Sequence, residues 1–412
     1  MTKKSDAPAI RFKGFSDAWE QRKAIDIADY SKGNGYSKGD LTDSGTPIIL
    51  YGRLYTKYQF AISEVDTFAV PRNGAVYSQG NEVIVPASGE TAEDIARASA
   101  VEKSGVLLGG DLNILRPFDF INPLFLALAI SNGEPQKELA KKAQGKSVVH
   151  IHNTDIQEVT IAYPSRTEQD RIVSVFRQLD NLITLHQRKF EKLTNVKKSM
   201  LEKMFPQNGS SYPEIRFKGF TDPWEQRKFS ELVQIERGGS PRPIDDFITD
   251  APNGLNWIKI GDAPTQGNYI TKTAEKIRPE GLSKTREVHP GDLILSNSMS
   301  FGKPYIMGID GCIHDGWLLI RNTYGVFDLT FLCHLLGTPQ MLSQYRSLAA
   351  GSTVNNLNKE LVGNTVVTIP SITEQRVLGD YLEQLDNLIT LHQRELEKLQ
   401  NIKKSMLEKM FV

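Results

Sequence analysis

The chain contains the same long helical segment twice. Residues 179–205, LDNLITLHQRKFEKLTNVKKSMLEKMF, return as residues 385–411, LDNLITLHQRELEKLQNIKKSMLEKMF, with four substitutions. In each copy the seam positions recur at alternating steps of four and three, which is the heptad pattern of a coiled coil. The predicted seam comprises Leu179, Ile183, His186, Phe190, Leu193 and Met200 in the first copy and Leu385, Ile389, His392, Leu396, Leu399 and Met406 in the second. A histidine at the same seam position of both copies favours a role in register and orientation over a role in chemistry.

Each helix also has a start signal. Residues 164–168, PSRTE, and residues 370–374, PSITE, place the S-x-x-E capping box directly after a proline. About forty residues at 1.5 Å per residue make a rod of roughly 60 Å. We therefore expect two long, matching helices, one at the end of each half of the chain.

The repeat covers each half and not only its helix. Residues 10–23, IRFKGFSDAWEQRK, recur as residues 215–228, IRFKGFTDPWEQRK, with two changes. Between this F-K-G-F segment, whose aromatic residues we expect to pack, and the helix lie roughly 140 residues that diverge almost completely between the halves. Both divergent regions contain short β-branched runs separated by polar, Gly-rich loops, which is typical of an α+β domain that displays loops.

These patterns predict an α+β fold with two globular domains separated by two long antiparallel helices that form a pseudo-twofold coiled coil. The predicted divisions are an F-K-G-F segment with the first globular domain (1–165), a central helix (166–205), a linker (206–213), an F-K-G-F segment with the second globular domain (214–371) and a C-terminal helix (372–412).

Composition limits the function. Lys plus Arg and Asp plus Glu both number 49, so the net charge is zero. This balance argues against a protein that coats nucleic acid nonspecifically, but it allows a specific reader with local basic loops. With two cysteines, no apolar run of about 20 residues and no apolar signal core, we expect a cytoplasmic protein without a disulfide framework or a membrane span.

Several enzyme motifs are approached but not completed. Residues 144–147, QGKS, end like a phosphate-binding loop, yet Ala140 stands where its first glycine belongs. Residues 122–125, NPLF, resemble the N-P-P-[YF] of amino-methyltransferases but have leucine for the second proline. The cysteines and histidines at 312–314 and 333–334 have poor spacing for one tetrahedral zinc site. We predict no catalytic residue, no metal and no cofactor bound by this chain.

Polar loop residues remain as candidates for binding DNA. Arg, Lys, Asn, Ser and Tyr are the side chains that contact phosphates and base edges. The predicted contacts are Lys32, Asn34, Tyr36, Ser37, Lys38, Arg53, Tyr55, Lys57 and Tyr58 in the first domain and Arg237, Ser240, Arg242, Lys259, Ser296, Asn297, Ser298, Ser300 and Lys303 in the second.

The whole chain resembles the DNA specificity (S) subunit of Type I restriction-modification systems. The most specific residues are the T-E-Q and L-D-N-L-I motifs and the K-K-S-M-L-E-K-M-F ending, at 167–205 and again at 373–411. The second divergent region is similar to a known recognition-domain type at 238–241, 257–262 and 291–296, whereas the first departs from it at 85–91, VPASGET.

The resemblance implies a protein that reads DNA without chemistry of its own. Each target recognition domain would read one half of a bipartite double-stranded target, and the helix pair would act as a ruler between them. The partners implied are two methyltransferase subunits, which use S-adenosylmethionine, and two restriction subunits, which use ATP and Mg. The methyltransferase subunits are expected on the outer faces of the helices and the F-K-G-F segments, because two identical partners need two equivalent surfaces.

Two other interpretations remain open at this point. A coiled-coil adaptor that binds only proteins would explain the helices, but not two divergent regions of equal size within a fixed frame. A nuclease or methylase with duplicated domains is disfavoured by the incomplete motifs.

Overall fold

The computed structural model describes residues 8–143, 145, 148–207, 209–297, 302–350 and 356–411. The chain divides into two compact units, Met1–Thr184 with Glu397–Val412, and Leu185–Leu396. Each unit contains one globular domain and a part of both long helices. The division between the units therefore falls within both long helices, at residues 184–185 and 396–397.

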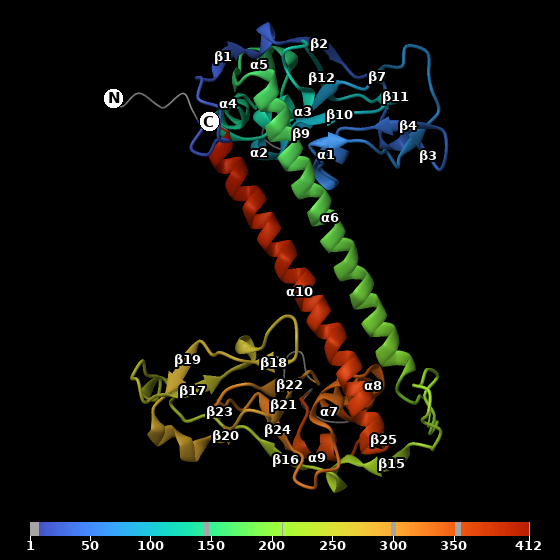
Figure 1. Ribbon diagram of the computed structural model, residues 1–412, viewed down its shortest axis with the longest axis vertical. Helices are drawn as coiled ribbons and strands as arrows, with labels where there is room; N and C mark the ends of the chain where they lie inside the picture. The colour runs from blue at the N-terminus through green and yellow to red at the C-terminus, as the bar shows by residue number, and fades with distance from the viewer. Residues whose placement is uncertain are drawn as a thin grey trace. The chain divides into compact units, whose positions relative to one another are not determined.

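The first unit is built on a five-stranded sheet in the order β2-β12-β8-β10-β5 (Figure 1). Its strands are β2 (Ala28–Lys32), β12 (Leu112–Pro117), β8 (Glu82–Pro86), β10 (Ser99–Val101) and β5 (Ala61–Ile62). A second sheet contains, in order, β3 (Leu41–Thr42), β6 (Phe68–Ala69), β4 (Thr46–Ile49), β11 (Ser104–Leu108) and β7 (Tyr77–Gln79). Two short pairs are β1 (Glu20–Lys23) with β14 (Thr160–Tyr163), and β9 (Ser88–Gly89) with β13 (Val149–His150).

The helices of the first half are α1 (Arg53–Thr56), α2 (Ala92–Ile95), α3 (Pro123–Ile130), α4 (Gly133–Lys142), α5 (Asn153–Gln157) and the long α6 (Arg166–Lys203). Helix α3 has the sequence PLFLALAI and lies against β8 and β10. A helix that is apolar on all sides must be buried, and residues 124–130 are buried.

The second unit repeats this plan with different residues. Its main sheet contains, in order, β16 (Gln234–Arg237), β24 (Trp317–Arg321), β21 (Leu293–Ser296), β22 (Pro304–Met307) and β18 (Tyr269–Ile270). A second sheet contains β19 (Glu275–Ile277), β17 (Leu255–Ile258), β23 (Gly311–Ile313) and β20 (Arg286–Val288), and a separate pair joins β15 (Glu225–Lys228) to β25 (Val366–Ile369). The helices are α7 (Leu329–Leu336), α8 (Pro339–Ala350), α9 (Lys359–Gly363) and the long α10 (Ile372–Met410).

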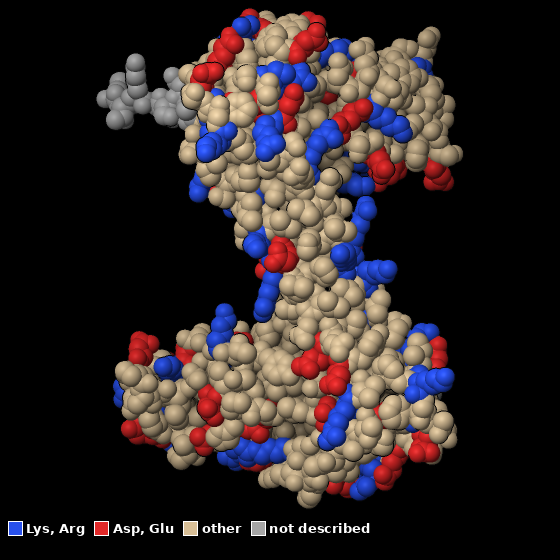
Figure 2. All heavy atoms as spheres, viewed as in Figure 1, with Lys and Arg blue, Asp and Glu red and all other residues tan. Residues whose placement is uncertain are grey.

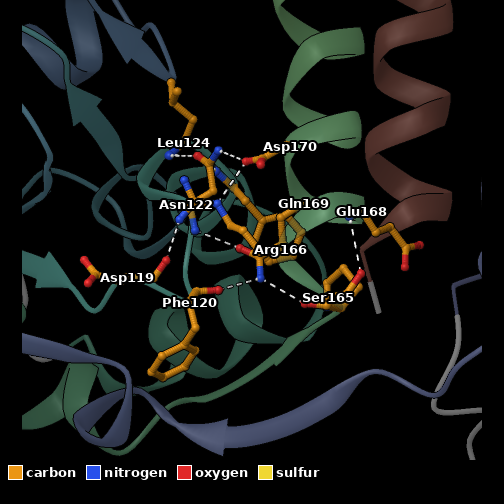
Figure 3. A network of polar contacts seen from close by, with 11 residues as sticks. Asp119, Phe120, Asn122, Leu124, Ser165, Arg166, Glu168, Gln169 and Asp170 are labelled. Carbon is orange, nitrogen blue, oxygen red and sulfur yellow. Dashed lines mark hydrogen bonds and ion pairs between the residues drawn. The ribbon is translucent and has the colours of Figure 1, made fainter.

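The start of each long helix is tied to its globular domain by a buried glutamine. Gln169 accepts a hydrogen bond from the Asn122 backbone N at 2.8 Å and donates to the carbonyl oxygens of Phe120 and Pro164 (Figure 3). In the second unit Gln375 makes the same three bonds, to the Asp328 backbone N and to the carbonyl oxygens of residues 326 and 370. The glutamine of the T-E-Q motif therefore fixes where the helix leaves the domain.

The predicted capping box forms only in part. The Ser165 Oγ accepts from the Glu168 backbone N at 3.4 Å, but the Glu168 carboxylate does not return to the helix start. It instead accepts two hydrogen bonds of 2.7 Å from Arg11 of the F-K-G-F segment. Glu374 binds Arg216 in the same bidentate way, since a planar guanidinium matches a carboxylate better than a backbone N–H does. The second half of the predicted capping box is therefore wrong in both units.

The aromatic residues of the F-K-G-F segments pack, as the sequence predicts. Trp19 and Trp224 are buried, and Phe12 and Phe217 lie partly buried against the cores of their units.

Within each unit the two long helices run antiparallel. Lys197 of α6 donates to Asp386 of α10 at 2.5 Å in the second unit, and Lys403 of α10 donates to Asp180 of α6 at 2.5 Å in the first. His186 and His392 face each other, with 3.1 Å between their Nδ1 atoms. The twelve predicted seam residues are all buried or partly buried. The predicted α+β class with a paired-helix coiled coil is confirmed.

Among the described residues, no helix has both the length and the apolar character needed to cross a membrane.

Candidate nucleic-acid interface

The sheet topology brings three loops to one edge in each domain. In the second domain Arg237 at the end of β16 pairs with Leu318, and Ser296 at the end of β21 pairs with Trp317 at the start of β24. The segments after β16, after β21 and before β24 therefore leave the sheet together. We call their described residues, 238–243, 297, 302–303 and 314–316, the second loop cluster.

The first domain has the same arrangement. Lys32 at the end of β2 pairs with Asn113 of β12, and Pro86 at the end of β8 pairs with Leu112 at the start of β12. The corresponding segments are 33–40, 87–91 and 109–111, and residues 70–75 pack beside them because Asn34 Nδ2 donates to the Gly74 carbonyl at 2.8 Å. We call these four segments the first loop cluster.

A glycine closes each cluster against the neighbouring loop. A Cβ on Gly33 would lie 1.9 Å from the Gly109 carbonyl oxygen, and a Cβ on Gly238 would lie 2.2 Å from the His314 carbonyl oxygen. No side chain fits at either distance. The backbone N atoms of both glycines donate across the sheet edge, to the Leu112 and Trp317 carbonyl oxygens, at 2.9 Å. The loops are thereby held close to the sheet.

Asp315 is the centre of the second loop cluster. Its carboxylate accepts hydrogen bonds from Ser240 Oγ at 3.1 Å and from Arg242 Nη2 at 3.3 Å, and it lies 2.9 Å from His314 Nε2. Asn297 Nδ2 donates to the Asp315 carbonyl at 2.9 Å. The Arg242 side chain is nonetheless 81% exposed. Asp315 thus holds one guanidinium nitrogen of an arginine whose side chain otherwise faces solvent.

Asp40 has the same role in the first loop cluster. It accepts from the backbone N of Ser37 at 2.8 Å and from Ser37 Oγ at 2.9 Å, and it forms an ion pair with Arg72. These contacts, the Ser37 backbone bond first, hold the pKa of the Asp40 carboxyl below its usual value. Arg72 also donates to the Gly35 carbonyl at 3.2 Å and lies over the Tyr36 ring, 5.2 Å from its centroid.

Lys32, Asn34, Ser37 and Lys38 lie exposed in or beside the first loop cluster. Tyr36 is 7% exposed, so its ring serves as a platform for Arg72.

Other candidates of the first domain are engaged within the domain. Arg53 and Lys57 each donate to Asp66 at 2.6 Å, and these bonds lower the pKa of Asp66 to about 2. Tyr55 donates to the Ser88 carbonyl, and Tyr58 donates to Ser131 Oγ at 3.2 Å. These four side chains support the domain, and reaching DNA would require breaking those contacts.

In the second domain, Arg237 and Lys303 are exposed, while Ser240 faces Asp315. Ser296 and Asn297 are 3% and 4% exposed and hold the loop from inside. Lys259 donates to Glu275 at 2.5 Å. The predicted contacts Ser298 and Ser300 lie outside the described residues.

Sequence reasoning did not find Arg72, Asp40 or Asp315. The only signal for Arg72 is its place in the turn-forming run VPRNGA at 70–75. Its partner Asp40 is 32 residues away, so no local spacing connects the two.

The incomplete enzyme motifs have structural explanations. Asn122 Oδ1 accepts from the backbone N atoms of Leu124 and Phe125, so NPLF is the capped start of the buried helix α3. Cys312 and Cys333 lie in separate hydrophobic clusters, and burial raises the pKa of both thiols to about 12. Within the part of the chain that the structure describes, no group of three His, Cys, Asp or Glu side chains could hold a metal ion. Residues 144, 146 and 147 of the QGKS run lie outside the described residues.

Acidic and basic side chains are mixed on the visible face of each domain, as Figure 2 shows. A surface that mixes positive and negative side chains favours DNA binding through a few specific side-chain contacts over general electrostatic attraction to phosphates.

Comparison with known proteins identifies the family. The model of the Type I restriction modification DNA specificity domain matches residues 16–195 and 221–401. The chain belongs to this family. The two matches cover the two halves, so the chain holds two specificity domains, each with its long helix. The resemblance seen in the T-E-Q and K-K-S-M-L-E-K-M-F motifs is confirmed.

Relatives of this specificity family span most of the chain. The Type I restriction enzyme MjaVIII specificity subunit of Methanocaldococcus jannaschii is 22% identical over 348 residues, which is 81% of this chain and 79% of the relative. The fold is similar to the crystal structure of a Type I S subunit from M. genitalium, with a TM-score of 0.65, 15% identity and coverage of 98% and 99% of the two chains. A chain from a study of Type I restriction-modification complex assembly is 16% identical, with a TM-score of 0.54 and coverage of 95% and 97%.

Proposed function

We propose that this chain is the DNA specificity subunit of a Type I restriction-modification complex and that each loop cluster reads one half of a bipartite target. The observation that carries the proposal is the repeated sheet edge. Both domains direct three loops from the same edge, both lock them with a glycine, and the loop residues differ. Two domains that present loops in the same arrangement but with different side chains suit a DNA target made of two different sequence elements.

The long helices would set the spacer. Gln169 and Gln375 make the same three bonds in their units, so each domain leaves its helix in the same way. A rigid helical connection fixes a distance better than a flexible linker does.

Two methyltransferase subunits would dock on the outer faces of the helices. Leu182 and Leu185 are 43% and 47% exposed, and their repeat counterparts Leu388 and Leu391 are 44% and 51% exposed. Exposed apolar side chains that recur at equal positions suit two copies of one partner. A groove lined by Phe12, among others, extends this surface onto the first F-K-G-F segment.

The chemistry would belong to the partner subunits. Methyl transfer from S-adenosylmethionine would occur in the methyltransferase subunits, and two restriction subunits would use ATP and Mg to translocate and cut DNA. This chain would bind none of these cofactors. Its cytoplasmic location stays a prediction.

The proposal is tested by expressing the chain with a methyltransferase subunit and mapping methylated adenines in the genome. The expected result is a motif of two short elements separated by a spacer of fixed length. An exchange of residues 229–365, which lie between β15 and β25, for those of another family member should change one element and leave the other element and the spacer intact. A single contiguous motif, or methylation without sequence preference, would contradict the proposal.

A further inference from the structure

Each loop cluster presents one exposed arginine that is held by an aspartate. Arg242 is 81% exposed and paired with Asp315, and Arg72 is 54% exposed and paired with Asp40. The two arginines come from different segments, since Arg242 follows β16 whereas Arg72 precedes β7. A similar pairing therefore occurs in both loop clusters without any local sequence similarity.

These pairs differ from the arginine–carboxylate pairs that hold the fold together. Arg11 and Arg216 are 14% exposed and bind their glutamates through both Nε and Nη2. Arg242 meets Asp315 through Nη2 alone, at 3.3 Å, so most of its five N–H donors remain available. Arg11 and Arg216 thus use two donor nitrogens on their partner carboxylate, whereas Arg242 uses one and keeps the others for a ligand.

The aspartate also decides what such an arginine can recognise. An arginine and the carboxylate beside it together have no net charge, so such an arginine adds little to the phosphate neutralisation that drives nonspecific binding. It keeps its planar fork of donors, which matches the O6 and N7 acceptors of guanine in the major groove. By contrast, Lys38 and Arg237 form no ion pair within the described residues and suit phosphates.

Anchoring also lowers the cost of binding. A free arginine loses much side-chain freedom when it is ordered against a base. Here Ser240 and His314 hold Asp315, which holds Arg242, and the Tyr36 ring and the Gly35 carbonyl hold Arg72. Both guanidinium groups are therefore oriented before DNA arrives.

We infer that Arg242 and Arg72 each read a guanine in the half-site of their own domain, with Asp315 and Asp40 as positioning residues. This inference rests on the proposed function. It requires each of the two target elements to contain at least one G·C base pair.

The test is methylome mapping with the intact complex carrying R242A or R242K in the specificity subunit. Both variants should relax one G·C position of one element, with a loss of discrimination of roughly 5- to 160-fold, because alanine removes the donors and lysine lacks the rigid planar fork of the guanidinium. The other element and the spacer should not change, and R72A should give the reciprocal result. R286A is the matched control, because Arg286 is 50% exposed and pairs with Glu236 outside the cluster.

The positioning role has its own readout. In D315A the freed Arg242 can neutralise a phosphate, so the slope of log affinity against log salt on nonspecific DNA should steepen by about one unit. A merely structural aspartate would leave this slope unchanged.

The outcomes separate the two proposals. A wild-type motif with two elements, one of which lacks G·C, overturns the arginine assignment and leaves the proposed function standing. So does an R242A variant that weakens methylation uniformly without altering the motif. A wild-type complex without a bipartite motif overturns the proposed function itself.

Discussion

Lengthening both long helices by whole heptads should lengthen the DNA spacer by an amount that can be calculated. The heptad LDNLITL is identical at residues 179–185 and 385–391, so it can be duplicated in α6 and α10 without a foreign sequence. The duplications fall between the Lys403–Asp180 pair of the first unit and the Lys197–Asp386 pair of the second, so each unit keeps its own pair. Because the seam repeats every seven residues, its register is preserved.

The expected change follows from helix geometry. One heptad adds about 10 Å at 1.5 Å per residue, which equals about three base pairs at 3.4 Å each. Three base pairs rotate a half-site by about 100° around the DNA axis, since a turn contains about 10.5 base pairs. A single duplication should therefore put the half-sites out of phase and weaken methylation strongly.

Three heptads should restore methylation. They add about 31 Å, or about nine base pairs by length. A left-handed supercoil with a pitch of about 150 Å rotates the added segment by about 75°. A spacer about eight or nine base pairs longer satisfies the length and the rotation to within about one base pair.

The assay is methylome mapping of cells that express each variant with the methyltransferase subunit. Both half-elements should remain those of the wild type. Duplication in α6 alone is the control, because it shifts Lys197 out of reach of Asp386 and should abolish methylation. A triple variant that methylates the wild-type spacer would refute the ruler argument.

Two further predictions concern stability. Glu374→Gln removes the charge that binds Arg216 at 2.7 Å, and we expect the second unit to lose about 3–5 kcal/mol of unfolding free energy, measured in urea. The control Glu360→Gln, at a side chain that is 64% exposed, should change this free energy little. Equal losses in the two variants would contradict the stabilising role of the Arg216–Glu374 pair. Burial, with a smaller effect of Lys197, lowers the pKa of His334 to about 3, so the unfolded state takes up a proton at this site first as pH falls below about 6.5. This group should therefore remove about 2 kcal/mol of stability between pH 7 and pH 5, and His334→Leu should lose about that much less over the same range. An equal loss in the two proteins would count against this assignment.

The sequence predicts the frame of the fold well because the frame is repeated. Heptad periodicity is a local property, and the two copies agree at almost every seam position, so the helix pair and its antiparallel symmetry follow directly. The fold class follows from the same comparison, since two halves with matching ends and divergent middles require two domains. Local pattern and tertiary structure agree here because the pattern is long.

Contacts between distant residues are what the sequence cannot predict. Glu168 stands where a capping box predicts a local bond, but its partner Arg11 is 157 residues away. Burial of loop residues is equally hard to predict from local sequence. Tyr36 and Asn297 are polar residues in turn-rich segments, which favours exposure, yet both are buried. Arg72 goes unnoticed because its partner Asp40 lies on another loop. Each difference arises where a tertiary contact competes with a local preference.

The division between repeated and divergent residues also explains how such a protein can change its target. The glutamine and the arginine–glutamate pair at the start of each long helix lie in the repeated segments: Gln169, Glu168 and Arg11 in one unit, and Gln375, Glu374 and Arg216 in the other. The arginines of the loop clusters lie in the divergent regions. A different recognition domain that keeps the pair β1–β14 or β15–β25 can therefore join the same long helices. These repeated contacts do not depend on which side chains occupy the loop cluster.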